Sequence, residues 1–398
     1  MDFESKLDIY LGSGSRIRAK IPRLQPPRIG QLRATPFGEI WQVDWEYSEG
    51  HLHGNHELVK ARAIHTLLDS SLSAFDPVAA RVIDTETTGL AGGTGTYAFI
   101  IGAGFWDGDR FIVRQYVMRD FGEESAQLWA FAQDSSEGIV SFNGKCFDIP
   151  LLLNRFRLHR FEPPFENQPH LDMLFPCRQV WKRHLSSFKL VDIEKSIIGF
   201  ARTDDLPSQL IPSIFFDFLQ NKDDNLLYPI LHHNRDDILS LYHLTVLASD
   251  LLNRYDGKGG NDDDLALSLA EMYFRRREYN QALAMLKNIR HEFAAPRTSV
   301  QARKLKALAL KRQGLWQEAC AEFDALYRLN PSLMAAIESA KLNEHKLRDL
   351  SGALDKVNRA IALSEFESYS GKAGTIMLAD LAKRKTRILG KIARLLQS

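Results

Sequence analysis

The chain has 398 residues, of which 44% are apolar and 25% are charged, and its formal net charge is +1. This composition predicts a soluble globular protein with two domains. No apolar run approaches the ~18 residues that cross a bilayer, and the opening MDFESKLDIY has no apolar signal segment. We therefore predict a cytoplasmic protein without a membrane partner. Three widely spaced cysteines indicate neither a disulfide framework nor a zinc site.

The first predicted elements are a strand at Pro36 to Trp45 and a helix at Glu57 to Leu68. They belong to an N-terminal extension, residues 1–76, that is expected to pack on the domain that follows. The next strand runs into VIDTETTGL, where Asp84 and Glu86 are one residue apart. Because side chains alternate along a strand, both carboxylates point to the same side and repel unless a cation lies between them. The alternative is an ordinary polar turn at the end of a strand.

Two more strands are predicted directly after this one. The first covers TYAFIIGAGFW, and Asp107-Gly108-Asp109 predicts a hairpin into the second, Phe111 to Met118. A helix near Glu123 to Ala132 precedes a short strand at Gly138 to Phe142. A strand that is reached through a helical crossover usually lies parallel to its partner.

The segment NGKCFDIPLLLNRF, which follows the short strand, contains the next acid. Asp148 begins a helix with apolar Leu152 and Phe156 on one face, so its carboxylate is expected at the helix N-terminus. As a purely structural feature, Asp148 would be a good N-cap. Asn143 and Lys145 would suit a phosphate or a leaving group beside an acidic site.

Three further helices are predicted before the last segment of this domain. The first, Pro169 to His184, carries Arg178 and Lys182 on a basic face that would suit a polyanion backbone, although solvated side chains are the ordinary interpretation. The others are Ser187 to Ile198, which ends at a glycine, and Ile211 to Leu219.

A long helix is predicted at Asn225 to Asn253. Projected at about 100° per residue, its apolar stripe has Asp237 in the middle and His233 on the same face. Asp236 and His232 point toward solvent or a flank. A carboxylate within an apolar stripe is costly unless something pairs with it, so Asp237 is the candidate functional acid. An ordinary histidine at the edge of the stripe is the alternative for His233.

The four carboxylates of Asp84, Glu86, Asp148 and Asp237 are thus predicted to converge. Hard oxygen ligands without cysteine favour Mg²⁺ or Mn²⁺ over zinc. Such a cluster supports phosphodiester hydrolysis with two divalent cations. His233 would orient or deprotonate the attacking water.

The motifs DTETTGL, FNGKxFDxP and HNxxDILSL resemble the three exonuclease motifs of the DEDD group in the ribonuclease H-like, or DnaQ-like, superfamily. The segments GGTGTYAF, HxDML and HNRDDILSL resemble the YprB-like family more narrowly. The resemblance covers roughly Phe37 to Leu252. It implies a mixed five-stranded sheet flanked by helices, two divalent ions and removal of nucleotides in the 3′-to-5′ direction.

Carried over by motif position, the resemblance assigns metal-ligand roles to Asp84, Glu86, Asp148 and Asp237. The candidate substrate-binding residues are Thr87, Asn143, Lys145, Arg178 and Lys182. The third motif departs from the pattern. The group has either a tyrosine at the position of His233 or a histidine at the position of His232, and here both residues are histidine. Helical phase favours His233, which stands where the tyrosine would be, so the identity of the base stays open.

The composition changes after the predicted nuclease domain, residues 77–256, and GKGGNDDD, residues 257–264, is the expected linker. Residues 265–398 are predicted to be all helical. Ala282, Ala319 and Ala353 occupy equivalent points, 319 − 282 = 37 and 353 − 319 = 34 residues apart, and the tetratricopeptide period is about 34. This region resembles a degenerate three-repeat array. It would hold a peptide or partner protein, or else serve as a helical cap that stabilises the nuclease domain.

The sequence therefore predicts an α/β ribonuclease H-like domain followed by an all-α helical-repeat domain. The predicted function is a metal-dependent nuclease, of 3′-to-5′ exonuclease type, that acts on DNA or RNA. The alternative is a non-catalytic scaffold that binds nucleic acid and recruits a protein partner through the repeats. The choice of DNA or RNA, and of single or double strands, stays open.

Overall fold

The computed structural model describes residues 27–61, 64–69, 76–89, 95–134, 136–203, 206–258, 262–290, 295–369 and 375–397. The chain divides into two compact units. The first comprises Met1–His51, Ala79–Gln168 and Arg202–Ser240, and the second Leu52–Val78, Pro169–Ala201 and Leu241–Ser398.

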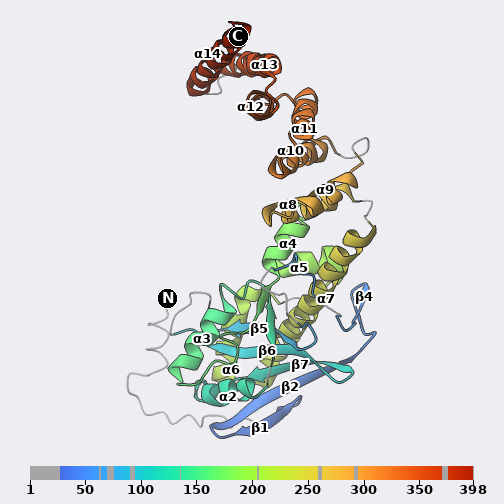
Figure 1. The fold of residues 1–398 in the computed structure, drawn as a ribbon. Coiled ribbons are helices and arrows are strands. Elements are labelled where there is room, and N and C mark those ends of the chain that lie inside the picture. Colours follow the sequence, from blue (N-terminus) through green and yellow to red (C-terminus); the bar gives the residue numbers. More distant parts are fainter. Residues whose placement is uncertain are drawn as a thin grey trace. The chain divides into compact units, whose positions relative to one another are not determined.

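The main sheet is mixed and, in the described part of the chain, has seven strands in the order β1-β2-β7-β6-β5-β8-β9 (Figure 1). Strand β5 pairs antiparallel with β6 and parallel with β8, as expected for a strand reached by a helical crossover. The strands are β1 (Gln31–Thr35), β2 (Gly38–Ser48), β5 (Ala80–Thr87), β6 (Ala98–Asp107), β7 (Arg110–Val117), β8 (Gly138–Ser141) and β9 (His170–Asp172).

The expected count of five strands was wrong, because the hairpin β1–β2 extends the sheet at one edge. Strand β2 pairs with β7 from Trp41 to Ser48. Its side chains Trp41 and Val43 are buried, and the Trp41 indole donates to the Ile29 carbonyl at 2.8 Å. The apolar side chains of β2 thus attach residues of the N-terminal extension to the sheet itself.

Helices cover both faces of this sheet. On one face, α2 (Glu124–Gln133) and α3 (Asp148–Leu158) pack against Ile83 and its neighbours. On the other, α6 (Ile211–Asn221) and the start of α7 (Tyr228–Lys258) pack against Phe99, whose ring stacks on that of Phe215 at a centroid distance of 4.0 Å. Side chains alternate along a strand. Because Ile83 faces α2 and α3, Asp84 and Glu86 face the opposite side of the sheet, where α7 lies.

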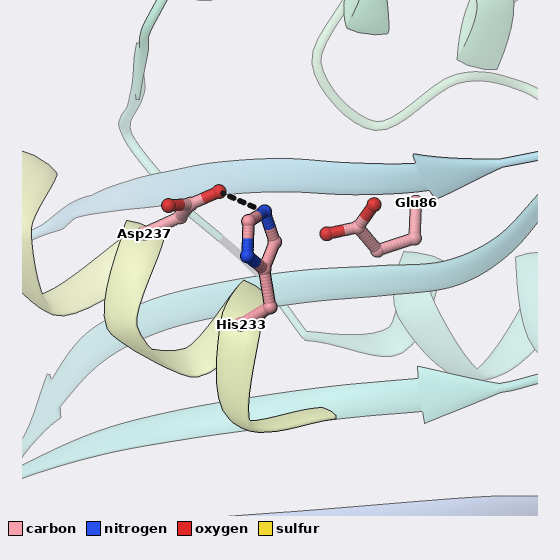
Figure 2. A group of neighbouring side chains, drawn as sticks. All are labelled: Glu86, His233 and Asp237. Atoms are coloured by element: carbon pink, nitrogen blue, oxygen red, sulfur yellow. Dashed lines mark ion pairs between the residues drawn. The ribbon is translucent and has the colours of Figure 1, made fainter. Parts of the chain in front are cut away.

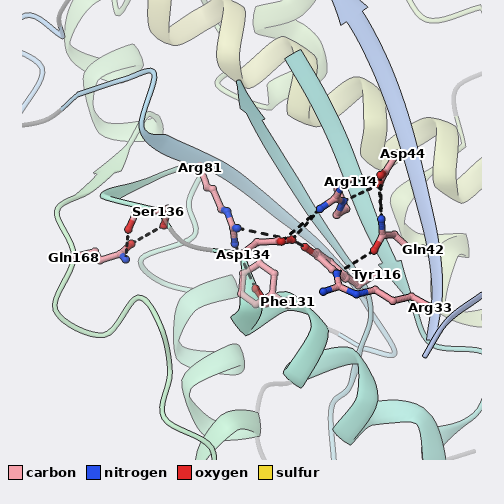
Figure 3. A network of polar contacts seen from close by, with 10 residues as sticks. All are labelled: Arg33, Gln42, Asp44, Arg81, Arg114, Tyr116, Phe131, Asp134, Ser136 and Gln168. Atoms are coloured by element: carbon pink, nitrogen blue, oxygen red, sulfur yellow. Dashed lines mark hydrogen bonds and ion pairs between the residues drawn. The ribbon is translucent and has the colours of Figure 1, made fainter. Parts of the chain in front are cut away.

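A partly buried polar network ties the beginning of β5 to the end of α2 (Figure 3). Asp134 accepts hydrogen bonds from the Tyr116 hydroxyl and, at 3.3 Å, from Arg114, and Arg81 lies 3.8 Å away. The Arg81 guanidinium lies over the Phe131 ring, 5.7 Å from its centroid. The network thus fixes the first residues of β5, the strand that carries Asp84 and Glu86 toward its other end.

The remaining described elements are mostly helices. Consecutive helices pack together, α8 with α9, α10 with α11 and α12 with α13, and the alanines that the repeat predicts to be equivalent are fully buried. These elements are β3 (Leu52–His53), β4 (His56–Glu57), α4 (Leu174–Val180), α5 (Leu190–Ile193), α8 (Asp263–Arg275), α9 (Tyr279–Lys287), α10 (Pro296–Gln313), α11 (Trp316–Leu329), α12 (Leu333–Leu342), α13 (Leu350–Tyr369) and α14 (Thr375–Gln397). Short 3-10 turns cover Phe121–Glu123, Ser208–Leu210 and Asp224–Leu226, and π-turns cover Glu194–Ile198 and Asn343–Leu347.

Three local predictions need correction. The described parts of Glu57 to Leu68 are not helical; their apolar side chains are buried, but backbone groups such as the Ala61 N–H bond to side chains elsewhere. The segment after Pro169 begins as strand β9 before α4 starts. Asp148 is the first residue of α3, and the N-cap is Phe147.

None of the described helices is long and apolar enough to cross a membrane. The predicted linker coincides with the end of α7 and the beginning of α8, and its central residues 259–261 lie outside the described residues.

Candidate active site

Strand β5 and helix α7 bring three predicted site residues together. Glu86 comes from the end of β5, and His233 and Asp237 lie one turn apart on α7. One ligand atom from each of the three lies within 4.8 Å of the others. Figure 2 shows the His233 ring between the Asp237 carboxylate and the Glu86 carboxylate. Two segments that are far apart in the sequence therefore supply one set of oxygen and nitrogen donors.

Asp84 lies beside this group and is held by a residue of α7. The Asn234 side-chain amide donates to the Asp84 carboxylate at 2.7 Å, and its own carbonyl oxygen accepts from Gln115 at 2.8 Å. Asn234 is fully buried. This pair of hydrogen bonds fixes which way the amide points and therefore fixes the Asp84 carboxylate.

The helix can come this close to the sheet because β6 has glycine where the two meet. A Cβ atom on Gly102 would collide with the Asn234 side chain and would lie 2.5 Å from Ile238. A Cβ on Gly104 would also lie 2.5 Å from Ile238. The two glycines thus remove the bulk that would otherwise hold α7, and with it His233 and Asp237, away from β5.

Asp148, the first residue of α3, is not one of the three residues of that group but is linked to β5. The Thr85 hydroxyl, between the two acids of β5, donates to the Asp148 carboxylate at 2.5 Å. The loop before α3 is tight: Asn143 has a φ of 64°, and a Cβ on Gly144 would lie 2.5 Å from the Ser141 hydroxyl. This loop and the Thr85 hydrogen bond bring the start of α3 to the end of β5.

The carboxylates are close enough to disturb one another's ionisation. Burial raises the pKa of Asp84 well above its usual value, and the negative charges of Asp237 and Asp148 raise it further. Burial likewise raises the pKa of Glu86, followed by the charges of Asp84, Asp237 and Asp148. All four predicted acids therefore share one electrostatic environment, in which an added cation would be strongly favoured.

Arg202 supplies positive charge to this environment. Its guanidinium forms an ion pair with Asp237 and donates to Nδ1 of His233 at 3.0 Å, and its side chain is 6% exposed. It also lowers the pKa of Asp84 and Glu86, although not enough to offset burial. Since Nδ1 accepts this bond, a neutral His233 carries its proton on Nε2, which lies 3.5 Å from the Asp237 carboxylate.

The neighbouring histidine and aspartate of α7 lie elsewhere. His232 accepts from Arg235 at 2.7 Å and lies 5.1 Å, between ring centroids, from Trp45. Asp236 pairs with Arg235 at 2.7 Å. The side chains of Asp236 and Asp237 are equally shielded, 16% and 15% exposed, so partners and not burial distinguish them. Asp236 lies on a flank of the helix rather than in solvent.

The predicted substrate-binding residues occupy different settings. The Thr87 hydroxyl donates to the Gly89 carbonyl at 3.0 Å, and Asn143 and exposed Lys145 lie in the loop before α3. Arg178 is an exposed residue of α4. Lys182 forms an ion pair with Glu271 of α8.

Sequence patterns missed three residues of this site: Arg202, Asn234 and Thr85. Asn234 had a signal, since it lies one turn before Asp237 on the same helix. Thr85 faces away from the acids that flank it, so the alternation of the strand gave no reason to choose it. Arg202 lies in an irregular segment after Gly199, where no periodic pattern applies.

Comparison with known proteins identifies the class. Residues 82–249 match the family model RNase_H_2, described as the RNase_H superfamily. This domain is therefore RNase H-like, a fold whose members generally hydrolyse nucleic acids, and whose nucleases typically use divalent metals. The matched region contains Asp84, Glu86, Asp148 and Asp237.

A second comparison covers most of the chain. Over 340 residues the chain is 30% identical to "Uncharacterized protein YprB" of Bacillus subtilis (strain 168), and the match spans 81% of each chain. The chain belongs to the YprB family, with an RNase H superfamily domain at residues 82–249.

Proposed function

We propose that this protein is a metal-dependent nuclease that hydrolyses the phosphodiester bonds of DNA or RNA. We further propose that it is an exonuclease that acts in the 3′-to-5′ direction. The observation that carries the proposal is the convergence of Glu86, His233 and Asp237, with Asp84 and Asp148 beside them. The superfamily match supports hydrolysis of nucleic acid, and the motif order supports the exonuclease type.

The donor set fits divalent cations. Four carboxylates in one electrostatic environment, two of them with raised pKa values, leave negative charge that a hard cation would stabilise. Asp84, Glu86, Asp148 and Asp237 would hold two ions, Mg²⁺ or Mn²⁺. When bound, such ions stabilise charge on the phosphate and lower the pKa of water.

His233 is the proposed general base. Its Nδ1 accepts from Arg202, so His233 can take a proton at that atom only after the guanidinium moves away. Its choice over His232 is supported by their positions, because His232 lies against Arg235 and Trp45. Thr87, Asn143 and Lys145 are proposed to contact the substrate near the ends of β5 and β8, and Arg178 and Lys182 to contact its backbone.

The test is degradation of end-labelled and circular DNA and RNA with Mg²⁺ and with Mn²⁺. We expect release of nucleotides from the 3′ end and no attack on circles. Asp84→Asn and Asp237→Asn should each lower the rate at least ~100-fold, because each removes a ligand charge. Asp236→Asn is the matched control, since Asp236 is equally shielded and lies beside Asp237, and it should retain activity.

A non-catalytic scaffold is the second candidate, and the ion pair between Arg202 and Asp237 favours it. An arginine that permanently neutralised the acids would leave a domain that binds nucleic acid without cutting it, while the tetratricopeptide-like repeats recruit a protein. If the wild-type protein cleaves none of the substrates with either ion, the scaffold replaces the nuclease.

A further inference from the structure

Each helical pair of the C-terminal region has an exposed cation at the same point of its turn. Arg275 ends α8, Arg312 is the penultimate residue of α10, and Lys346 is the penultimate residue of the π-turn after α12. The spacings, 312 − 275 = 37 and 346 − 312 = 34, equal those between the buried alanines of α9, α11 and α13. We call Arg275, Arg312 and Lys346 the turn cations.

Two hollows in the surface connect the turn cations. The first is lined by Phe274, Arg275, Arg277, Tyr279 and Arg312. The lining of the second includes Lys311, Arg312, Trp316, Lys341, His345 and Lys346. Because Arg312 belongs to both, the hollows adjoin. Within the described residues, neither hollow is lined by a carboxylate.

The charges of the turn cations are not neutralised. Among the described residues, no carboxylate lies within ion-pair distance of Arg275, Arg312 or Lys346. Arg275 donates to the neutral amide of Gln179 at 2.8 Å, and the Lys346 ammonium lies 4.8 Å from the centroid of the Trp316 ring. By contrast, Lys341 of α12, which lines the second hollow, is paired with Glu338 at 2.7 Å.

The backbone of the turns repeats as well. The residue two positions after each turn cation is left-handed: Arg277 has a φ of 64°, Gly314 of 80° and Arg348 of 58°. Glycine avoids the steric cost of this conformation, yet in two of the three turns the residue is an arginine. The first of them, Arg277, lines the hollow beside Arg275 and adds to its charge.

We propose that this surface binds single-stranded nucleic acid, with the turn cations on the phosphates and the rings of Phe274, Tyr279 and Trp316 beside the bases. A row of cations that follows a backbone, together with aromatic rings, is the usual arrangement for single-strand binding. The rings favour a nucleic acid over an acidic protein segment, whose carboxylates need only the cations. The inference rests on the proposed function for the class of ligand and adds a second binding surface to it.

The experiment measures binding of fluorescein-labelled oligo(dT) and oligo(U) by anisotropy, with full-length protein in EDTA, so that no cleavage occurs. Each phosphate contact contributes ~0.7 to the salt slope of log K for a single strand. In the triple variant Arg275→Gln, Arg312→Gln, Lys346→Gln, three contacts are lost, so we expect this slope to fall by about 2. We expect the affinity at ~0.1 M salt to fall by up to about 100-fold. Thermal unfolding followed by circular dichroism verifies that the variant is folded.

Two further variants test whether a loss of affinity comes from the turn cations or from the aromatic rings. The matched control is Lys304→Gln, Arg328→Gln, Lys383→Gln, which removes three exposed cations outside the hollows and should leave the slope unchanged. Tyr279→Leu should weaken binding about tenfold and leave the slope unchanged, because it removes stacking and no charge.

The outcomes distinguish this inference from the proposed function. Wild-type affinity and slope in the triple variant, or an equal loss in the control, would overturn the surface. So would tighter binding of poly-glutamate than of either oligonucleotide, which would assign the surface to an acidic protein. Loss of binding in the triple variant, in a protein that cleaves no substrate with either ion, would support the surface while rejecting the nuclease.

Discussion

Replacing Arg202 by glutamine tests whether this arginine supplies the positive charge that balances Asp84, Glu86, Asp148 and Asp237. The Arg202 side chain is 6% exposed, and the side chain of Asp237, with which it forms an ion pair, is 15% exposed. Removing one partner of a buried ion pair costs about 3–5 kcal/mol, because the other charge stays buried without compensation. We therefore expect Arg202→Gln to lower the free energy of unfolding by about 3 kcal/mol in EDTA at about pH 8.

The loss should depend on pH with a definite sign. Burial raises the folded pKa of Asp84 and Glu86, and Arg202 opposes that rise. An acid with a raised folded pKa adds stability below its unfolded pKa, and this stability is lost as the pH rises through the folded pKa. Without Arg202 both pKa values rise further, so the deficit should be larger at about pH 8 than at about pH 5.

Divalent ions should reverse the loss. A ligand that binds only the folded state stabilises it in proportion to its occupancy, and without the competing guanidinium an ion should bind more tightly. Urea unfolding with EDTA, Mg²⁺ or Mn²⁺ should therefore show a larger gain from the ions in Arg202→Gln than in the wild type.

The control is Arg110→Gln, which breaks an ion pair with Glu46 whose side chains are 63% and 51% exposed. It should cost less than about 1 kcal/mol and show no dependence on divalent ions. The reasoning is refuted if Arg202→Gln is as stable as the wild type in EDTA, or if the ions stabilise both proteins equally.

Three further measurements test other parts of the structure. His233→Gln should slow nucleic-acid cleavage about 100-fold while His232→Gln stays near wild type, and the reverse pattern would reassign the base. Gly102→Ala should cost about 1–3 kcal/mol in urea unfolding, because its Cβ would overlap Asn234 and Ile238; Gly390→Ala, in open space on α14, should instead stabilise by about 0.5–1 kcal/mol. Burial raises the pKa of Asp134 to about 6, so its contribution is lost as pH rises from about 4 to 6. Relative to wild type, Asp134→Asn should gain about 1–2 kcal/mol between about pH 4 and 7, after allowance for solvent screening, and a relative loss would show that the pairing with Arg81 and Arg114 dominates.

Periodicity predicted the parts of the fold that depend on neighbours along the chain. The alternation of β5 predicted Asp84 and Glu86 on one face. The projection of α7 predicted His233 and Asp237 together, and the structure shows these two beside Glu86. The same method failed for Glu57 to Leu68, since burial of apolar residues at a spacing of three or four does not require a helix when the backbone bonds elsewhere.

Local sequence patterns could not predict that the sheet has seven strands over the described residues or that the hairpin β1–β2 extends it. A strand such as β2 looks the same in sequence whether it pairs with another sheet or extends this one, because register depends on its partner. Likewise, the closeness of α7 to β6 follows from Gly102 and Gly104, whose meaning appears only once the helix lies across them.

The sequence by itself determined which acids can share a face, and it indicated the superfamily through the order of its motifs. Tertiary structure alone decided that Arg202 pairs with Asp237 and His233, that Asn234 holds Asp84, and that Thr85 holds Asp148. The physical reason is that periodicity records how a segment faces its surroundings. Which partner lies across a distance of about 3 Å depends on how separate segments pack.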